Sequence, residues 1–117
     1  MAHSFRGSIK YIDEYRRLHF IPDQSTDEYS TLTDMLTARA NGAKLPIYEK
    51  KAGTPDAYKV VRINLSKYEK PNIRKYESLV GAQLIVKVEI VCYDHAEYGK
   101  GVSLKLLKYP TRIIPAE

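Results

Sequence analysis

The sequence predicts a mainly β fold in which about five strands close into a small barrel, with one α-helix in a connection. Two observations favour this fold. Apolar and polar residues alternate along several short segments, which is typical of strands with one buried face. Apolar residues at helical spacing occur in a segment that carries its own start and stop signals. The 117 residues suffice for one modest core, so we expect a single domain over residues 1–117.

Two strands are predicted before the helix. Residues 5–12 alternate, and residues 17–21 form a shorter strand that ends at Pro22. We expect one face of this pair to point into the core, with further aromatic residues packed nearby. The residues expected to pack in this way are Phe5, Ile9, Tyr11, Tyr15, Phe20 and Tyr29.

The helix is predicted between residues 25 and 42. Ser25 and Glu28 have the spacing of a capping box, in which an N-cap hydroxyl is followed three residues later by a carboxylate. Asn41 and Gly42 supply a stop signal. The apolar residues at helical spacing between these signals are Tyr29, Leu32, Leu36 and Ala40.

Three further strands are predicted at residues 57–65, 83–94 and 102–109, and residues 66–78 predict a polar connection or a short helix. A closed five-stranded barrel of the OB type accommodates this order and leaves no exposed sheet edge. The residues expected to face inward are Val61, Ile63, Leu65, Leu84, Val86, Val88, Ile90, Cys92, Val102, Leu104 and Leu106.

The charge balance favours a polyanionic partner. The net charge is +5, and nine basic residues stand against three acidic ones within residues 44–76. A single cysteine, Cys92, excludes an intrachain disulfide framework and a cysteine-based zinc site. The sequence has no apolar run of bilayer length, and its first ten residues are too polar for a signal peptide. We therefore expect an intracellular protein that is neither secreted nor embedded in a membrane.

Tyrosines and basic residues are interleaved along the chain. Ten Tyr against two Phe indicate that several rings lie at a wet surface. Flat rings stack on bases and cations neutralise phosphates, as binding of a single strand without reading its sequence requires. The hypothesis is that these residues share one groove. The stacking candidates are Tyr48, Tyr58, Tyr68, Tyr93 and Tyr98, and the phosphate-binding candidates are Lys59, Arg62, Lys87, Lys100 and Lys105.

Motifs in the C-terminal third are similar to those of a known family. They read KPNI at residues 70–73, GAQLIV at 81–86, YD at 93–94 and YGKGVSLKL at 98–106. In this order they resemble the single-stranded DNA-binding proteins of T7-like phages and their relatives in other phages and large DNA viruses. The resemblance covers about a third of the chain.

The resemblance implies an OB barrel that coats single-stranded DNA during viral or phage replication or recombination. It also implies a homodimer that works beside replication or recombination proteins, in the host cytoplasm or at the site of viral DNA replication. The T7-like members end in an acidic tail that recruits replication enzymes. The last five residues here, IIPAE, hold one acidic residue, so we do not expect recruitment of that kind. We expect neither catalysis nor a cofactor.

Two other functions stay open from the sequence. One is an OB-fold adaptor whose groove holds a peptide or a replication subunit; its binding would lack the steep salt dependence of strand coating. The other is a small metal-dependent nuclease. Its carboxylates would be Asp13, Glu14 and Asp94, but adjacent side chains on a strand point in opposite directions. The three histidines lack ligand spacing, so we do not expect a metal site.

Overall fold

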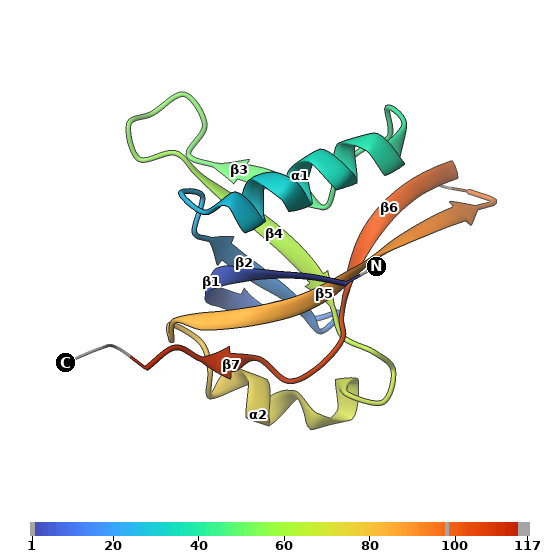
Figure 1. Cartoon of the computed structure of the whole chain (residues 1–117). Helices are drawn as coiled ribbons and strands as arrows, with labels where there is room; N and C mark the ends of the chain where they lie inside the picture. Colours follow the sequence, from blue (N-terminus) through green and yellow to red (C-terminus); the bar gives the residue numbers. More distant parts are fainter. Residues whose placement is uncertain (1, 98, 115–117) are drawn as a thin grey trace.

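Five strands close into a barrel in the computed structural model, which describes residues 2–97 and 99–114 (Figure 1). The order around the barrel is β1–β2–β4–β6–β5 and back to β1. Neighbours are antiparallel except β4 and β6, which pair in parallel. This closed order is OB-like, so the predicted fold class is confirmed. The barrel strands are β1 (Ala2–Ile12), β2 (Arg17–Pro22), β4 (Tyr58–Asn64), β5 (Leu84–His95) and β6 (Gly99–Leu106).

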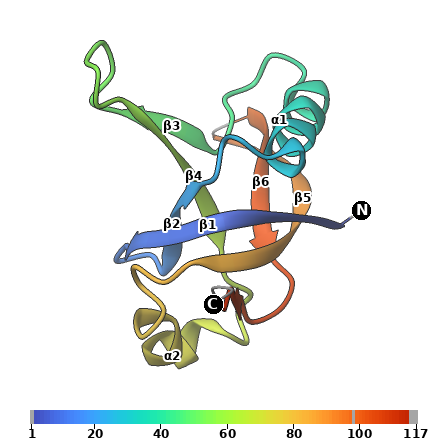
Figure 2. The ribbon, with the colours of Figure 1, turned by 60° about the vertical axis from the view of Figure 1, so that its left-hand side comes forward.

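Short elements extend the barrel at both ends. β3 (Ile47–Lys50) forms a projecting hairpin with β4, and β7 (Thr111–Arg112) pairs with β5. Helix α1 (Asp27–Ala40) covers one end of the barrel, while the 3-10 turn η1 (Lys70–Asn72) and helix α2 (Ile73–Glu77) lie at the other (Figure 2). Of the two alternatives predicted for residues 66–78, a polar connection or a short helix, the structure has the short helix, which is a second helix beside the one predicted. Within the described residues, no helix has the length and apolarity needed to cross a membrane.

Helix α1 begins one residue later than the capping box predicts. Its N-cap is Thr26, whose hydroxyl accepts a hydrogen bond from the Tyr29 amide at 3.4 Å. Ser25 instead donates its hydroxyl to the Asp23 carboxylate at 2.6 Å, because Asp23 forms a local turn that competes for it. The stop signal is correct, since the C-cap residue Asn41 is left-handed with a φ of 47°.

The core fills the barrel and the space beneath α1. Phe5 and Phe20 meet edge to face with their ring centroids 5.2 Å apart, and Leu32 and Leu36 of α1 are buried in the same cluster. The residues predicted to face inward from the later strands are buried, with one exception. Cys92 is exposed, because it follows Ile90, the last buried residue of β5, and lines an open hollow beside the end of α1. Beyond this point β5 and β6 continue as a two-stranded hairpin (Figure 1).

The predicted orientation of Tyr11 is wrong for a local reason. The β1–β2 register passes from Ile9 opposite Phe20 to Tyr11 opposite His19, so Lys10 is an extra residue in β1. Such a β-bulge shifts the alternation by one residue, and it turns Tyr11 to the outer face of the barrel. Among the other tyrosines expected to pack, the one at position 29 is buried and the one at position 15, in the β1–β2 turn, is exposed.

Gly7 marks a close approach of β1 to β2. A Cβ added there would collide with the Ile21 carbonyl oxygen and lie 2.6 Å from the Phe20 ring. We therefore expect Gly7→Ala to destabilise the protein by about 1–3 kcal/mol, measured by urea unfolding. Ser4→Ala changes an exposed position of the same strand and should shift stability by less than about 0.5 kcal/mol. Equal unfolding midpoints for the two variants would contradict this account of the β1–β2 contact.

Candidate nucleic-acid interface

Two adjoining hollows form a trough along one side of the barrel, and a third hollow meets this trough at Tyr93. The central hollow lies between β2, β4 and the β5–β6 hairpin, and it is lined by Arg17, Pro46, Arg62, Asn64, Tyr93, Val102 and Ser103. The lower hollow shares Asn64 and Ser103 and adds Leu65, Ser66, Lys67, Tyr68, Val91 and Lys105. The third, upper hollow shares only Tyr93 and includes Arg39, Asp94 and Lys100; in the β5–β6 register Asp94 and Lys100 are paired on the opposite face of the hairpin from Tyr93.

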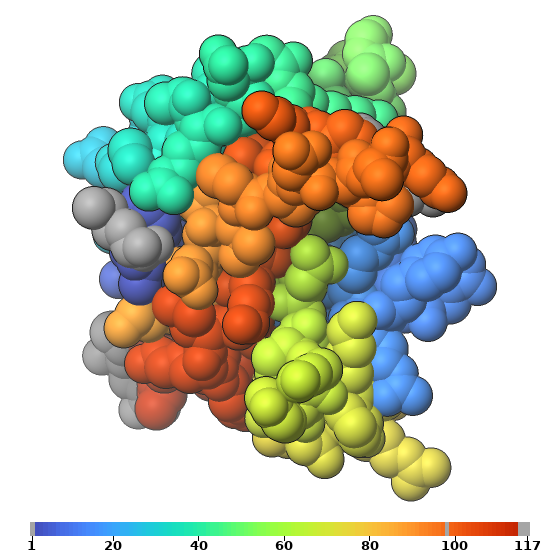
Figure 3. Space-filling model, turned by 90° about the vertical axis from the view of Figure 1, so that its right-hand side faces the viewer, coloured from blue at the N-terminus to red at the C-terminus, as the bar shows by residue number. Residues whose placement is uncertain are grey.

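The trough lies where OB barrels commonly bind oligonucleotides, over their second and third strands and between two loops. Here those strands are β2 and β4, and the loops are the β1–β2 and β5–β6 turns. Figure 3 looks onto this side of the molecule. The depression lies between the orange hairpin, the blue β1–β2 turn and the yellow-green segment that follows β4.

The trough brings together four of the ten residues predicted to bind DNA, Arg62, Tyr68, Tyr93 and Lys105. Lys100 lines the upper hollow that meets the trough at Tyr93. Tyr48 and Tyr58 lie on the adjoining outer face of β3 and β4. Their position depends on the strand order, which the sequence pattern did not provide.

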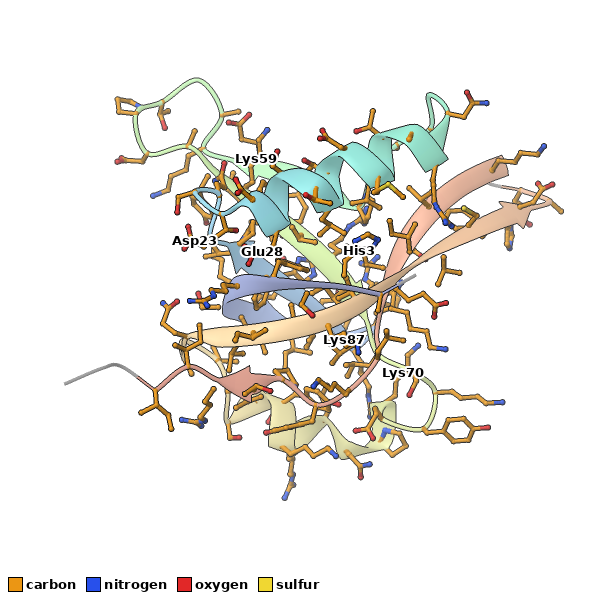
Figure 4. The ribbon with its side chains drawn as sticks, viewed as in Figure 1. His3, Asp23, Glu28, Lys59, Lys70 and Lys87 are labelled. Atoms are coloured by element: carbon orange, nitrogen blue, oxygen red, sulfur yellow. The ribbon has the colours of Figure 1, made fainter. Side chains whose placement is uncertain are left out.

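Two of the three other predicted residues are separate from the trough. Lys59 lies on the same face of β4 as the inward Val61, two residues further on. Its Nζ is 3.7 Å from the Glu49 carboxylate, near the start of α1 (Figure 4). Lys87 is exposed on β5, as its outward position predicts, but it does not line the hollows of the trough. Tyr98 lies outside the described residues.

Gly101 leaves the space in which the Tyr93 ring lies, and this space is the seat of the ring. Tyr93 and Gly101 are opposite each other in the β5–β6 register, and a Cβ on Gly101 would fall 2.5 Å from the Tyr93 Cζ. The ring therefore lies across the glycine backbone, in space that any other side chain would occupy. Tyr93 remains 44% exposed at the junction of the upper and central hollows.

Arg62 has a hydrogen-bond donor, free among the described residues, with which it can bind an anionic ligand. Its Nε is buried and has no hydrogen-bond partner within residues 2–97 and 99–114. An unpaired buried donor is costly, so a ligand that accepts its hydrogen bond would be favoured. The planar guanidinium group suits the geometry of a phosphate, with which it forms paired hydrogen bonds.

A hydrogen-bonded network beside the trough holds Arg17 in place. The Asp13 carboxylate accepts hydrogen bonds from the Arg17 Nε at 2.7 Å and from the His19 Nε2 at 2.8 Å. The His19 Nδ1 lies 2.6 Å from the Tyr48 hydroxyl. Burial raises the pKa of Asp13, but hydrogen bonds from the Arg17 backbone, the His19 ring and the Arg17 side chain outweigh it and lower the pKa to about 2.

Sequence reasoning missed Asp13, Arg17 and His19 as part of a site. Their spacing in the sequence could have indicated this network. A turn at residues 13–16 brings the Asp13 carboxylate back to the start of β2. Asp13, one of the carboxylates of the nuclease alternative, accepts hydrogen bonds from Arg17 and His19 in the structure.

Comparisons of the chain with protein-family models, with curated proteins and with solved structures gave no match. In the part of the chain that the structure describes, no group of three or more His, Cys, Asp or Glu side chains has an arrangement that would hold a metal ion.

Acid should weaken the fold through Asp13. Its pKa in the folded protein is about 2, below the ordinary value of 3.8, so its contribution to stability is present above about pH 4 and is lost as the pH falls towards 2. Partial exposure limits this contribution to roughly 1 kcal/mol. We expect urea unfolding of Asp13→Asn to show a correspondingly smaller loss of stability over that range. Glu14→Gln, at the exposed neighbour, should follow the wild-type profile. Parallel profiles for Asp13→Asn and the wild type would contradict the assignment.

Proposed function

We propose that the protein binds single-stranded DNA along the trough without reading its sequence, and that it acts in viral or phage DNA replication or recombination. One observation carries the proposal. Exposed tyrosine rings and basic groups line the joined central and lower hollows, at the position where OB barrels bind oligonucleotides. The resemblance of residues 70–108 to phage single-stranded DNA-binding proteins supports the same function.

The exposed rings provide platforms for bases. Tyr93 is 44% exposed at the upper end of the trough, and Tyr68 is 76% exposed at its lower end, with the Lys67 Nζ 5.2 Å from the ring centroid. Stacking of a base on an aromatic ring contributes roughly 1–3 kcal/mol and tolerates every base. In a duplex the bases stack on each other, so these platforms favour a single strand.

Basic groups line both hollows of the trough. Arg17 and Arg62 lie in the central hollow and Lys67 and Lys105 in the lower one, while Lys100 lines the upper hollow beyond Tyr93. Within the described residues, no ion pair engages Arg62 or Lys105. Their charges are therefore available to phosphates, and binding would release counterions and depend on salt.

Fluorescence anisotropy with labelled strands tests the proposal. We expect similar affinity for dT20 and a mixed-sequence 20-mer, weaker binding of the corresponding duplex, and a steep loss of affinity as salt rises. Equal affinity for duplex and single strand would remove the stacking argument. Salt-insensitive binding of a peptide with no binding of DNA would favour an adaptor instead. Magnesium-dependent shortening of the strand would favour a nuclease.

Removal of the Arg62 charge should weaken binding in a salt-dependent way. We expect Arg62→Gln to raise the Kd for dT20 roughly tenfold and to lower the slope of log K against log salt by about one. Lys87→Gln removes the same charge outside the trough and is the matched control. If both variants lose affinity equally, general electrostatic attraction rather than the trough accounts for binding.

The Tyr93 seat can be tested without removing the ring. Gly101→Ala should displace the ring from the wall of the trough and raise the Kd for dT20 roughly 5- to 30-fold, as should Tyr93→Leu. Tyr93→Phe keeps the ring and should bind like the wild type. Thermal melting checks that each variant folds. Unchanged affinity in both Gly101→Ala and Tyr93→Leu would show that Tyr93 does not stack on a base.

A further inference from the structure

We propose that Tyr11 is a further stacking platform, which receives a nucleobase where the strand leaves the trough past Arg62. This inference rests on the proposed function and extends the binding surface onto the outer faces of β1, β2 and β4. Tyr11 lies outside the trough lining and was expected from the sequence to pack inside the protein.

The Tyr11 ring has one covered face and one open face. It stacks on the His19 ring with the centroids 4.1 Å apart and an interplanar angle of 11°. His19 is 5% exposed beneath it, whereas Tyr11 is 39% exposed. A base stacking on the open face would extend an aromatic pair that is already formed.

The backing ring of His19 is held at both nitrogens. Its Nε2 lies 2.8 Å from the Asp13 carboxylate and its Nδ1 lies 2.6 Å from the Tyr48 hydroxyl. Tyr48 belongs to β3 and His19 to β2, so their hydrogen bond spans β4, where Val60 lies on the same face and is fully buried. The platform is therefore ordered before a ligand arrives, which reduces the entropic cost of binding.

Basic groups flank the platform and connect it with the trough. Arg62 is opposite His19 in the β2–β4 register and also lines the central hollow. On the other side, the β-bulge places Lys10 next to Tyr11, with its Nζ 4.7 Å from the Tyr58 ring centroid. A ring between cations that continues a basic trough suits a base between two phosphates better than an apolar peptide.

Strand length separates this inference from the proposed function. A series from dT4 to dT20 should show that Arg62→Gln weakens binding at every length. Tyr11→Leu should weaken only strands long enough to reach past Arg62, by roughly 5- to 30-fold for dT20. Tyr11→Phe keeps the stacking surface and should bind within about twofold of the wild type at all lengths. Thermal melting confirms that the variants are folded.

Crosslinking gives a direct readout of the contact. Strands carrying 5-iododeoxyuridine, irradiated in complex with the wild-type protein, should yield an adduct on Tyr11, located by peptide mass spectrometry. If Tyr11→Leu binds every length like the wild type while Arg62→Gln still weakens binding, the platform is overturned and the proposed function stands. If the wild type does not bind dT20, both are overturned.

Discussion

The trough depends on how β4 and β6 meet. The two strands share one register pair, Asn64 with Lys105, and then diverge, β4 towards its hairpin with β3 and β6 into its hairpin with β5 (Figure 1). A barrel wall that separates in this way leaves a depression between its strands, and side chains from both strands line it. Outward residues that would otherwise be scattered over a convex surface therefore face a common space. The position of this opening decides which residues can act on one ligand.

Backbone irregularities then set where the aromatic rings lie. The bulge at Lys10 turns Tyr11 outward, and the missing side chain of Gly101 leaves room for the Tyr93 ring. The bulge and the glycine are features of the neighbouring backbone, and neither is a property of the tyrosine that it positions. They leave the rings of Tyr11 on β1 and Tyr93 on β5 partly exposed on the outside of the barrel.

An acidic group organises this basic surface. Asp13 orients Arg17 at the trough and His19 beneath Tyr11, so one carboxylate supports both a phosphate-facing group and a stacking platform. Its charge offsets part of the local positive potential, but it restricts the side chains that a ligand would otherwise have to order. Preorganisation of this kind reduces the entropic cost of binding.

The sequence by itself determined the elements and the inward faces of the barrel. Strict alternation in β4, β5 and β6 identified most of their buried residues, because each residue step along a strand reverses the side-chain direction, but it left out Val60, which is fully buried on the outer face of β4. It also determined which functional groups are available for binding, namely ten tyrosine rings and an excess of basic over acidic side chains. Only the tertiary structure decided which of these residues share a surface. Tyr68 and Tyr93 line one trough while Lys59 and Lys87 lie apart from it, because strand order and divergence set distances that alternation does not contain. Likewise, Tyr11 faces outward because of a bulge, and Cys92 is exposed because it lines an open hollow beside the end of α1.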